Sequence, residues 1–314
     1  MAFKLTRADG EILWIVAECR LMTTPQLAAL LSRNGKSLKK RISELVTQGL
    51  LADAPRGPGQ RRGRPERLVS LAQRGVGVLQ ERELIDPQVP TKEVLGERLP
   101  PQSHQLLLNW VRVHLHHVGT VVPELTVRFL AHNAPFLPPG FSNLSILTGA
   151  VSNQARPQRS PRIEPDAAFS ISDTTQDRTV LFFLEVDRGT ETAASPRRKP
   201  TDIRQKILNY GICFDTCAYK KYEELWDCRL NGFRLLFVTD STARLSQLCA
   251  LVQAMPPSDY IWLTTAKRMF EDGIGAEIWV RGGRLNDAAD LAVCGAALED
   301  ETRGNLEWGC EERS

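Results

Sequence analysis

Three carboxylates stand at the ends of two apolar runs near the middle of the chain. Asp166 comes directly before the run 167–171 (AAFSI), and Glu185 and Asp187 close the run 180–187 (VLFFLEVD). Burying an unpaired carboxylate is costly, so these positions need a metal ion, a basic partner or an exposed cleft. Carboxylate oxygens suit Mg²⁺ or Mn²⁺, which also bind water and phosphate oxygens. The pattern therefore predicts a divalent-metal site with Asp166, Glu185 and Asp187 as metal ligands.

The two apolar runs are expected to be neighbouring strands joined by the turn 173–177 (DTTQD). Side chains alternate along a strand, so Glu185 and Asp187 should point to one face. An antiparallel pairing of the two strands would bring Asp166 beside them.

The segments that follow alternate between helix and strand patterns. Continuous apolar strands alternating with helices indicate a mixed sheet covered on both faces, so the predicted fold class is α/β. We expect helices over 199–222 and 241–255, and strands over 232–240, 260–265 and 276–280.

Positive charge is concentrated at the N-terminal end. Residues 1–82 contain 15 Lys and Arg against 7 Asp and Glu, whereas the whole chain has a formal net charge of +3. Such segregation suggests that the N-terminal part meets a polyanion. Three helix patterns are followed there by two short strands around the arginine-rich segment 55–65 (PRGPGQRRGRP). This is the order of a winged helix-turn-helix, in which the third helix enters the major groove and the wing touches the backbone or minor groove.

Basic and polar residues of the third helix and of the wing are the predicted contacts to double-stranded DNA. A solvated helix face and an ordinary mobile loop are the alternative explanations for the same residues. The predicted DNA-binding residues are Lys36, Lys39, Lys40, Ser43, Arg56, Arg61, Arg62, Arg64 and Arg67.

The spacing of PD, LEVD and a helix with Lys206 and Tyr210 resembles the PD-(D/E)xK nuclease superfamily. The N-terminal winged helix joined to EPDAAFSI, FFLEVDRGTE and KILNY resembles the replication-relaxation family of bacterial plasmids and integrative elements. The resemblance covers roughly residues 8 to 240. It implies an N-terminal winged helix-turn-helix followed by a PD-(D/E)xK-like mixed sheet flanked by helices.

The resemblance also implies catalytic roles for Asp166, Glu185, Asp187 and Lys206. Asp166 and Glu185 match the metal-binding positions of the nuclease motif, with Mg²⁺ or Mn²⁺ as the implied cofactor. The lysine normally found two residues after the acid is Asp187 here, so Lys206 on the following helix is the candidate replacement. Glu124 is the candidate for an additional acid on a helix before the sheet.

The expected domain organisation has four parts: a winged-helix domain over 1–82, a connector and helical segment over 83–132, a nuclease-like α/β domain over 133–298 and an acidic tail over 299–314. No apolar run is long enough to span a membrane, so we expect a cytoplasmic location. The seven cysteines lack paired CxxC spacing and are expected to be reduced core residues.

The leading hypothesis is a double-stranded DNA-binding protein of plasmid or mobile-element replication, with a homodimer as a further possibility. A metal-dependent DNA endonuclease of plasmid processing, transposition or phage defence is the second hypothesis. A winged-helix transcription regulator is the third, although a ligand sensor does not require clustered acids.

Overall fold

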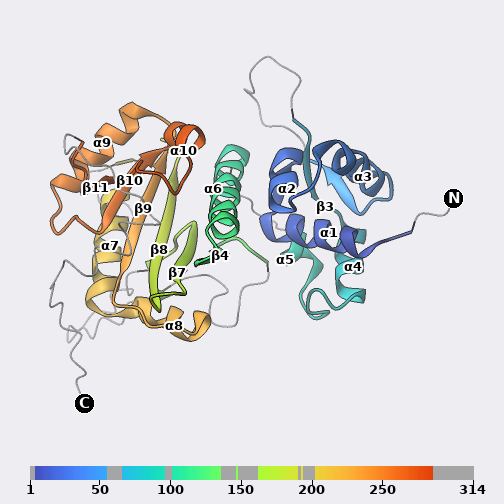
Figure 1. The fold of residues 1–314 in the computed structure, drawn as a ribbon, viewed down its shortest axis with the longest axis horizontal. Coiled ribbons are helices and arrows are strands. Elements are labelled where there is room, and N and C mark those ends of the chain that lie inside the picture. The colour runs from blue at the N-terminus through green and yellow to red at the C-terminus, as the bar shows by residue number, and fades with distance from the viewer. Residues whose placement is uncertain are drawn as a thin grey trace. The chain divides into compact units, whose positions relative to one another are not determined.

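The structure is a computed structural model that describes residues 4–54, 66–95, 101–135, 146–147, 162–189, 192–193 and 202–285. It divides into two compact units (Figure 1). The first contains residues 1–117 and 133–142, and the second contains residues 118–132 and 143–314.

The first unit combines short helices with a small antiparallel sheet of strand order β1-β3-β2. Its elements are α1 (Arg7–Cys19), β1 (Leu21–Thr23), α2 (Thr24–Leu30), α3 (Gly35–Thr47), β2 (Leu51–Asp53), β3 (Leu68–Leu71), α4 (Gln73–Glu81), α5 (Thr91–Leu95) and most of α6 (Gln102–Val121).

Local sequence explains where the first helices begin. The Thr6 hydroxyl and the Asp9 carboxylate form a capping box at α1, and Thr23 and Gln26 form another at α2. At α3 the Asn34 side chain accepts a hydrogen bond from the Lys36 amide.

The core of the first unit extends beyond residue 82, where the sequence analysis placed a domain boundary. Val76 and Leu79 of α4, together with Ile85 and Val94, are buried in the same cluster as the apolar residues of α1 to α3. The segment 83–132, expected to be a connector, therefore contributes Ile85 and Val94 of α5 to this core. Strand β1 was not predicted because its three residues are too few to show a period.

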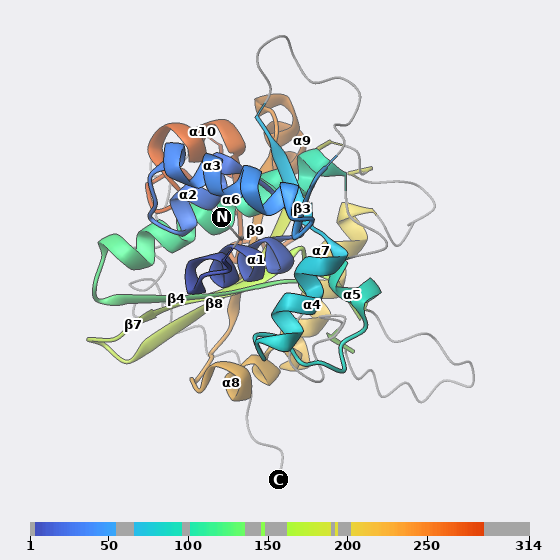
Figure 2. The same ribbon diagram turned by 90° about the vertical axis from the view of Figure 1, so that its right-hand side faces the viewer.

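The second unit contains a six-stranded sheet of order β11-β10-β9-β8-β7-β4, seen in part in Figure 2. Strands β8, β9 and β10 are parallel to one another, and the other pairs are antiparallel. The predicted α/β class, a mixed sheet with flanking helices, is confirmed. The elements are β4 (Leu125–Ala131), β5 (Ile146–Leu147), β6 (Arg162–Ile163), β7 (Ala167–Asp173), β8 (Arg178–Asp187), α7 (Ile203–Asp215), the 3₁₀ helix η1 (Ala218–Lys220), α8 (Lys221–Trp226), β9 (Phe233–Thr239), α9 (Thr242–Gln253), β10 (Ile261–Thr265), α10 (Ala266–Asp272) and β11 (Val280–Arg281).

Helices α7 and α9 lie along the same side of this sheet (Figure 1). Phe183 of β8 lies against α7 and β9: its ring centroid is 5.5 Å from that of Tyr210 on α7 and 4.9 Å from that of Phe233 on β9. This aromatic contact fixes α7 against β8 two residues before Glu185.

Within the described ranges, no helix is both long and apolar enough to cross a membrane. Cys19, Cys213, Cys228 and Cys249 are free, as predicted. Cys217 is disulfide-bonded, so the prediction of seven reduced cysteines is wrong at that position.

Candidate functional site

The β7–β8 hairpin places Asp166 next to Glu185. The strands pair in antiparallel register with Ala167 opposite Leu184, so the residue before β7 reaches the end of β8. The Asp166 amide donates to the Leu184 carbonyl oxygen over 3.0 Å, and Asp166 Oδ2 accepts a hydrogen bond from the Val186 amide over 2.7 Å. A short turn between two strands thus brings together two carboxylates that are 19 positions apart in the chain.

Glu185 is buried, and two side chains of α7 hold its carboxylate. Lys206 Nζ lies 3.0 Å from Oε2, and the Tyr210 hydroxyl donates to Oε1 over 2.7 Å. Lys206 and Tyr210 are four residues apart on a helix, so they share one face and reach the same carboxylate. Helix α7 begins directly before them because the Asp202 side chain caps it.

The pKa of Glu185 is raised to about 7: burial raises it most, the nearby Lys206 ammonium lowers it, and the negative charge of Asp166 raises it. Burial is the largest of these effects because it removes water from the charged form. The Tyr210 hydroxyl is also held protonated, since burial and the Glu185 charge raise its pKa well above the usual range. Tyr210 therefore acts as a hydrogen-bond donor to Glu185.

Asp187 has a different partner. Arg244 Nε of α9 lies 2.5 Å from its Oδ2, and the Gly189 amide donates to its Oδ1 over 2.9 Å. Both side chains are buried, with 9% of the Arg244 side chain and 3% of the Asp187 side chain exposed. The carboxylate is thus neutralised by a cation that the sequence analysis did not associate with it.

The predicted metal-ligand trio does not form in the part of the chain that the structure describes, where no three His, Cys, Asp or Glu side chains gather as a metal-binding group. Asp166 and Glu185 lie next to each other, whereas Asp187 forms an ion pair with Arg244. The two adjacent carboxylates can still supply some of the oxygen ligands of a divalent cation, because an ionised carboxylate offers about four acceptor sites.

Glu124 is not an additional acid of this site. The segment 123–130 was expected to precede the sheet, but it leads directly into the edge strand β4, which pairs with β7. Glu124 lies at the end of that pair where Leu125 faces Asp173, and its carbonyl oxygen accepts a hydrogen bond from the Thr174 amide. Ala131 and Ala167 form the other end, next to Asp166. The length of β7 separates Glu124 from Asp166, about 20 Å at the rise of a strand.

In the first unit, α3 presents the predicted DNA-binding lysines on one exposed face. Lys36, Lys39, Lys40 and Ser43 follow the i, i+3, i+4, i+7 spacing of a helix face and are all exposed. The opposite face carries the buried residues Leu38, Ile42 and Leu45. Among the residues that the structure describes, no carboxylate pairs with any of the three lysines.

Arg67 is held within the unit. Its Nε and Nη2 atoms lie 2.5 and 3.0 Å from the two carboxylate oxygens of Asp53, and its Nη1 donates to Ser43 Oγ over 2.7 Å. It therefore connects the hairpin strands to α3. The other arginines predicted to bind DNA, Arg56, Arg61, Arg62 and Arg64, lie outside the described residues.

The family model described as replication-relaxation matches residues 13–210, more than half of the chain. The chain belongs to the replication-relaxation family. No curated protein and no solved structure matches it.

The part of the chain that matches the replication-relaxation family contains α3 and the group Asp166, Glu185, Lys206 and Tyr210. Arg244 lies beyond the match. Two hydrogen bonds in this region were not predicted from the sequence: the one from Tyr210 to Glu185 and the one from Arg244 to Asp187. The spacing of Tyr210 from Lys206 was a usable signal, whereas nothing in the local sequence around Arg244 indicates its pairing with Asp187.

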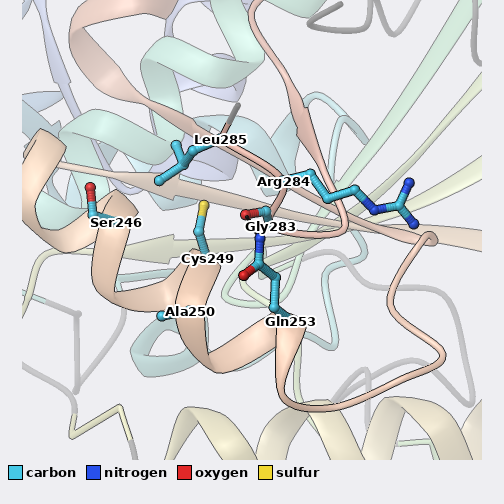
Figure 3. A pocket seen from close by; sticks show the side chains of 7 residues that line it. All are labelled: Ser246, Cys249, Ala250, Gln253, Gly283, Arg284 and Leu285. Atoms are coloured by element: carbon cyan, nitrogen blue, oxygen red, sulfur yellow. Dashed lines mark hydrogen bonds between the residues drawn. The ribbon is translucent and has the colours of Figure 1, made fainter. Parts of the chain in front are cut away.

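A cavity of about 320 Å³ lies in the second unit between α9 and the residues after β11 (Figure 3). Two of its polar side chains are already paired: Gln253 Nε2 donates to the Gly283 carbonyl oxygen over 2.8 Å, and Arg284 contacts Asp259. Cys249 also lines the cavity, and burial raises the pKa of its thiol to about 11, which keeps it protonated and unreactive. None of the predicted site residues lines this cavity.

Proposed function

We propose that this member of the replication-relaxation family is a double-stranded DNA-binding protein of plasmid or mobile-element replication. The observation that carries the proposal is the exposed lysine face of α3. The order of α1, α2 and α3 with an antiparallel β2–β3 pair supports a winged helix, in which the third helix enters the major groove. The second unit then supplies a nuclease-like α/β domain.

The difference between arginines and lysines in the first unit supports this use of α3. Each described arginine there contacts a carboxylate or a backbone carbonyl of the same unit, so its guanidinium group already has a partner within the unit. These residues are Arg7, Arg20, Arg33, Arg41, Arg67, Arg74, Arg82 and Arg112. Among the described residues the three lysines of α3 have no such partner, and cations without an internal partner on one helix face are what a polyanion binds.

Replacing Lys39 and Lys40 by alanine is expected to weaken binding of the full chain to duplex DNA by about ten-fold at moderate salt, because two phosphate contacts are lost. The matched control is Lys4→Ala with Lys92→Ala, which removes the same charge from two other exposed positions. Fluorescence anisotropy with a labelled duplex measures both. Equal losses in the two variants would mean that α3 is not the contact surface.

A metal-dependent DNA endonuclease is a second candidate function, and the cluster around Glu185 favours it. Asp166 and Glu185 would hold Mg²⁺ or Mn²⁺, and when bound such a cation supplies polarisation of a phosphate and of a water molecule. The Lys206 ammonium, 3.0 Å from Glu185, would offset the negative charge that develops on the phosphate. Tyr210 would hold Glu185 in one orientation through its hydrogen bond.

Under this second candidate, the protein is expected to nick supercoiled plasmid with Mg²⁺ or Mn²⁺, and Asp166→Asn or Glu185→Gln should reduce nicking at least a hundred-fold. Glu124→Gln is the control, because that carboxylate lies at the other end of the β4–β7 pair. Gel electrophoresis of the plasmid measures the products. Nicking that survives both site variants would point to a contaminating nuclease, and an inactive wild-type protein would leave DNA binding as the function.

The ligand-sensing transcription regulator and the homodimer stay predictions from the sequence. The acidic tail over 299–314 lies outside the described residues.

A further inference from the structure

The exposed face of α3 offers DNA only one kind of hydrogen-bond donor. Three hydroxyl groups on this helix donate to its own backbone: Ser37 Oγ to the Asn34 carbonyl oxygen, Ser43 Oγ to that of Lys39 and Thr47 Oγ1 to that of Ser43, each over 3.0 Å. Ser43 Oγ also accepts from Arg67. These hydroxyl protons are used within the unit, so the ammonium groups of Lys36, Lys39 and Lys40 are the donors that remain.

Arginine and asparagine, two residue types that read base edges by paired hydrogen bonds, are engaged within the protein between residues 34 and 47. Arginine or lysine reads guanine, and asparagine or glutamine reads adenine, through two simultaneous bonds. Arg41 is instead bound to Asp9 and Glu44. Asn34 uses its Oδ1 to accept from the Lys36 amide, which engages one of its two lone pairs and holds the side chain at the start of the helix.

Lysine can bind guanine O6 and N7, but it also binds phosphates whatever the base sequence. Its ammonium is a strongly hydrated point charge on a flexible stem, without the rigid fork that gives arginine its geometric selectivity. Contacts to phosphates position a protein on a duplex but carry no sequence information directly.

We propose that α3 binds duplex DNA through its phosphates and does not read the base sequence, so that this helix accepts duplexes of unrestricted sequence. The proposal rests on the proposed DNA-binding function and names the substrate class of the same surface. Site selection, if the full protein has any, must then come from residues other than those of α3.

The test compares binding of the full chain to GC-rich, AT-rich and mixed duplexes of equal length over a series of salt concentrations. The variants are Lys36→Ala/Lys39→Ala/Lys40→Ala and the charge-preserving Lys36→Arg/Lys39→Arg/Lys40→Arg. The alanine variant should lose affinity by the same factor on every duplex. The slope of log K against log salt should fall in magnitude by about 2.7, since each phosphate contact contributes about 0.9. The arginine variant should retain the wild-type slope.

The outcomes separate the two proposals. Failure of the wild-type protein to bind any duplex would overturn the proposed DNA-binding function itself. Binding with a strong preference for one duplex that the alanine variant loses would overturn only the inference about α3. An unchanged salt slope in the alanine variant would also overturn it. A preference that survives the alanine substitutions, together with the reduced slope, supports phosphate contacts by α3 and base reading elsewhere.

Discussion

Replacing Arg244 by alanine is expected to destabilise the second unit by about 3–5 kcal/mol, because the substitution leaves the Asp187 carboxylate buried without its counter-charge. The two side chains are 9% and 3% exposed, so water cannot replace the missing guanidinium without opening the contact between β8 and α9. Urea denaturation followed by circular dichroism measures the loss of stability.

Two controls distinguish this pair from an ordinary surface contact. Lys267 and Glu271 form an ion pair whose side chains are 76% and 59% exposed, and Lys267→Ala should change stability by no more than about 0.5 kcal/mol. The double variant Asp187→Leu/Arg244→Met should recover much of the stability lost in Arg244→Ala, since it removes both charges and keeps apolar volume. A loss in Arg244→Ala no larger than in Lys267→Ala would contradict the buried pair.

Replacing Glu185 by glutamine is expected to stabilise the protein by about 3 kcal/mol at pH 8 and by less than about 0.5 kcal/mol near pH 4.5. The folded state raises the pKa of Glu185 to about 7 from an ordinary value of 4.5. Protonated Glu185 therefore favours the folded state below pH 4.5, and this contribution is lost as the pH rises from 4.5 through about 7. Glutamine stays neutral throughout, so the stability of the variant should lack this pH dependence.

The measurement is the free energy of unfolding of both proteins across this pH range, in buffer with a chelator to exclude metal ions. Lys206→Met is the matched comparison: it removes the cation that lowers the pKa of Glu185, so it should destabilise the protein more at pH 8 than at pH 5. Lower stability of Glu185→Gln at pH 8 would show that the contact with Lys206 outweighs the cost of burial. A gain in stability with loss of function would mark Glu185 as a residue kept for its chemistry.

The positions of Asp166, Glu185 and Lys206 could be predicted because each depends on local structure. A short turn fixes the register of β7 against β8, and strand alternation fixes the face on which Glu185 lies. Helical periodicity then puts Lys206 and Tyr210 on one side of α7, from which both reach Glu185. The amphipathic pattern of α3 likewise determined which of its lysines are exposed.

Only the tertiary structure decided which charges neutralise one another. Asp187 and Glu185 share a strand face and are two residues apart, yet Asp187 is bound by an arginine 57 positions further along the chain. Arg67, predicted to bind DNA, pairs with Asp53 because β2 and β3 lie side by side, and this pairing was not predicted. A periodic pattern records which face of an element is buried, because burial depends on the residues of that element. The partner of a charge depends on which other element packs against that face, and this is determined only when the chain folds.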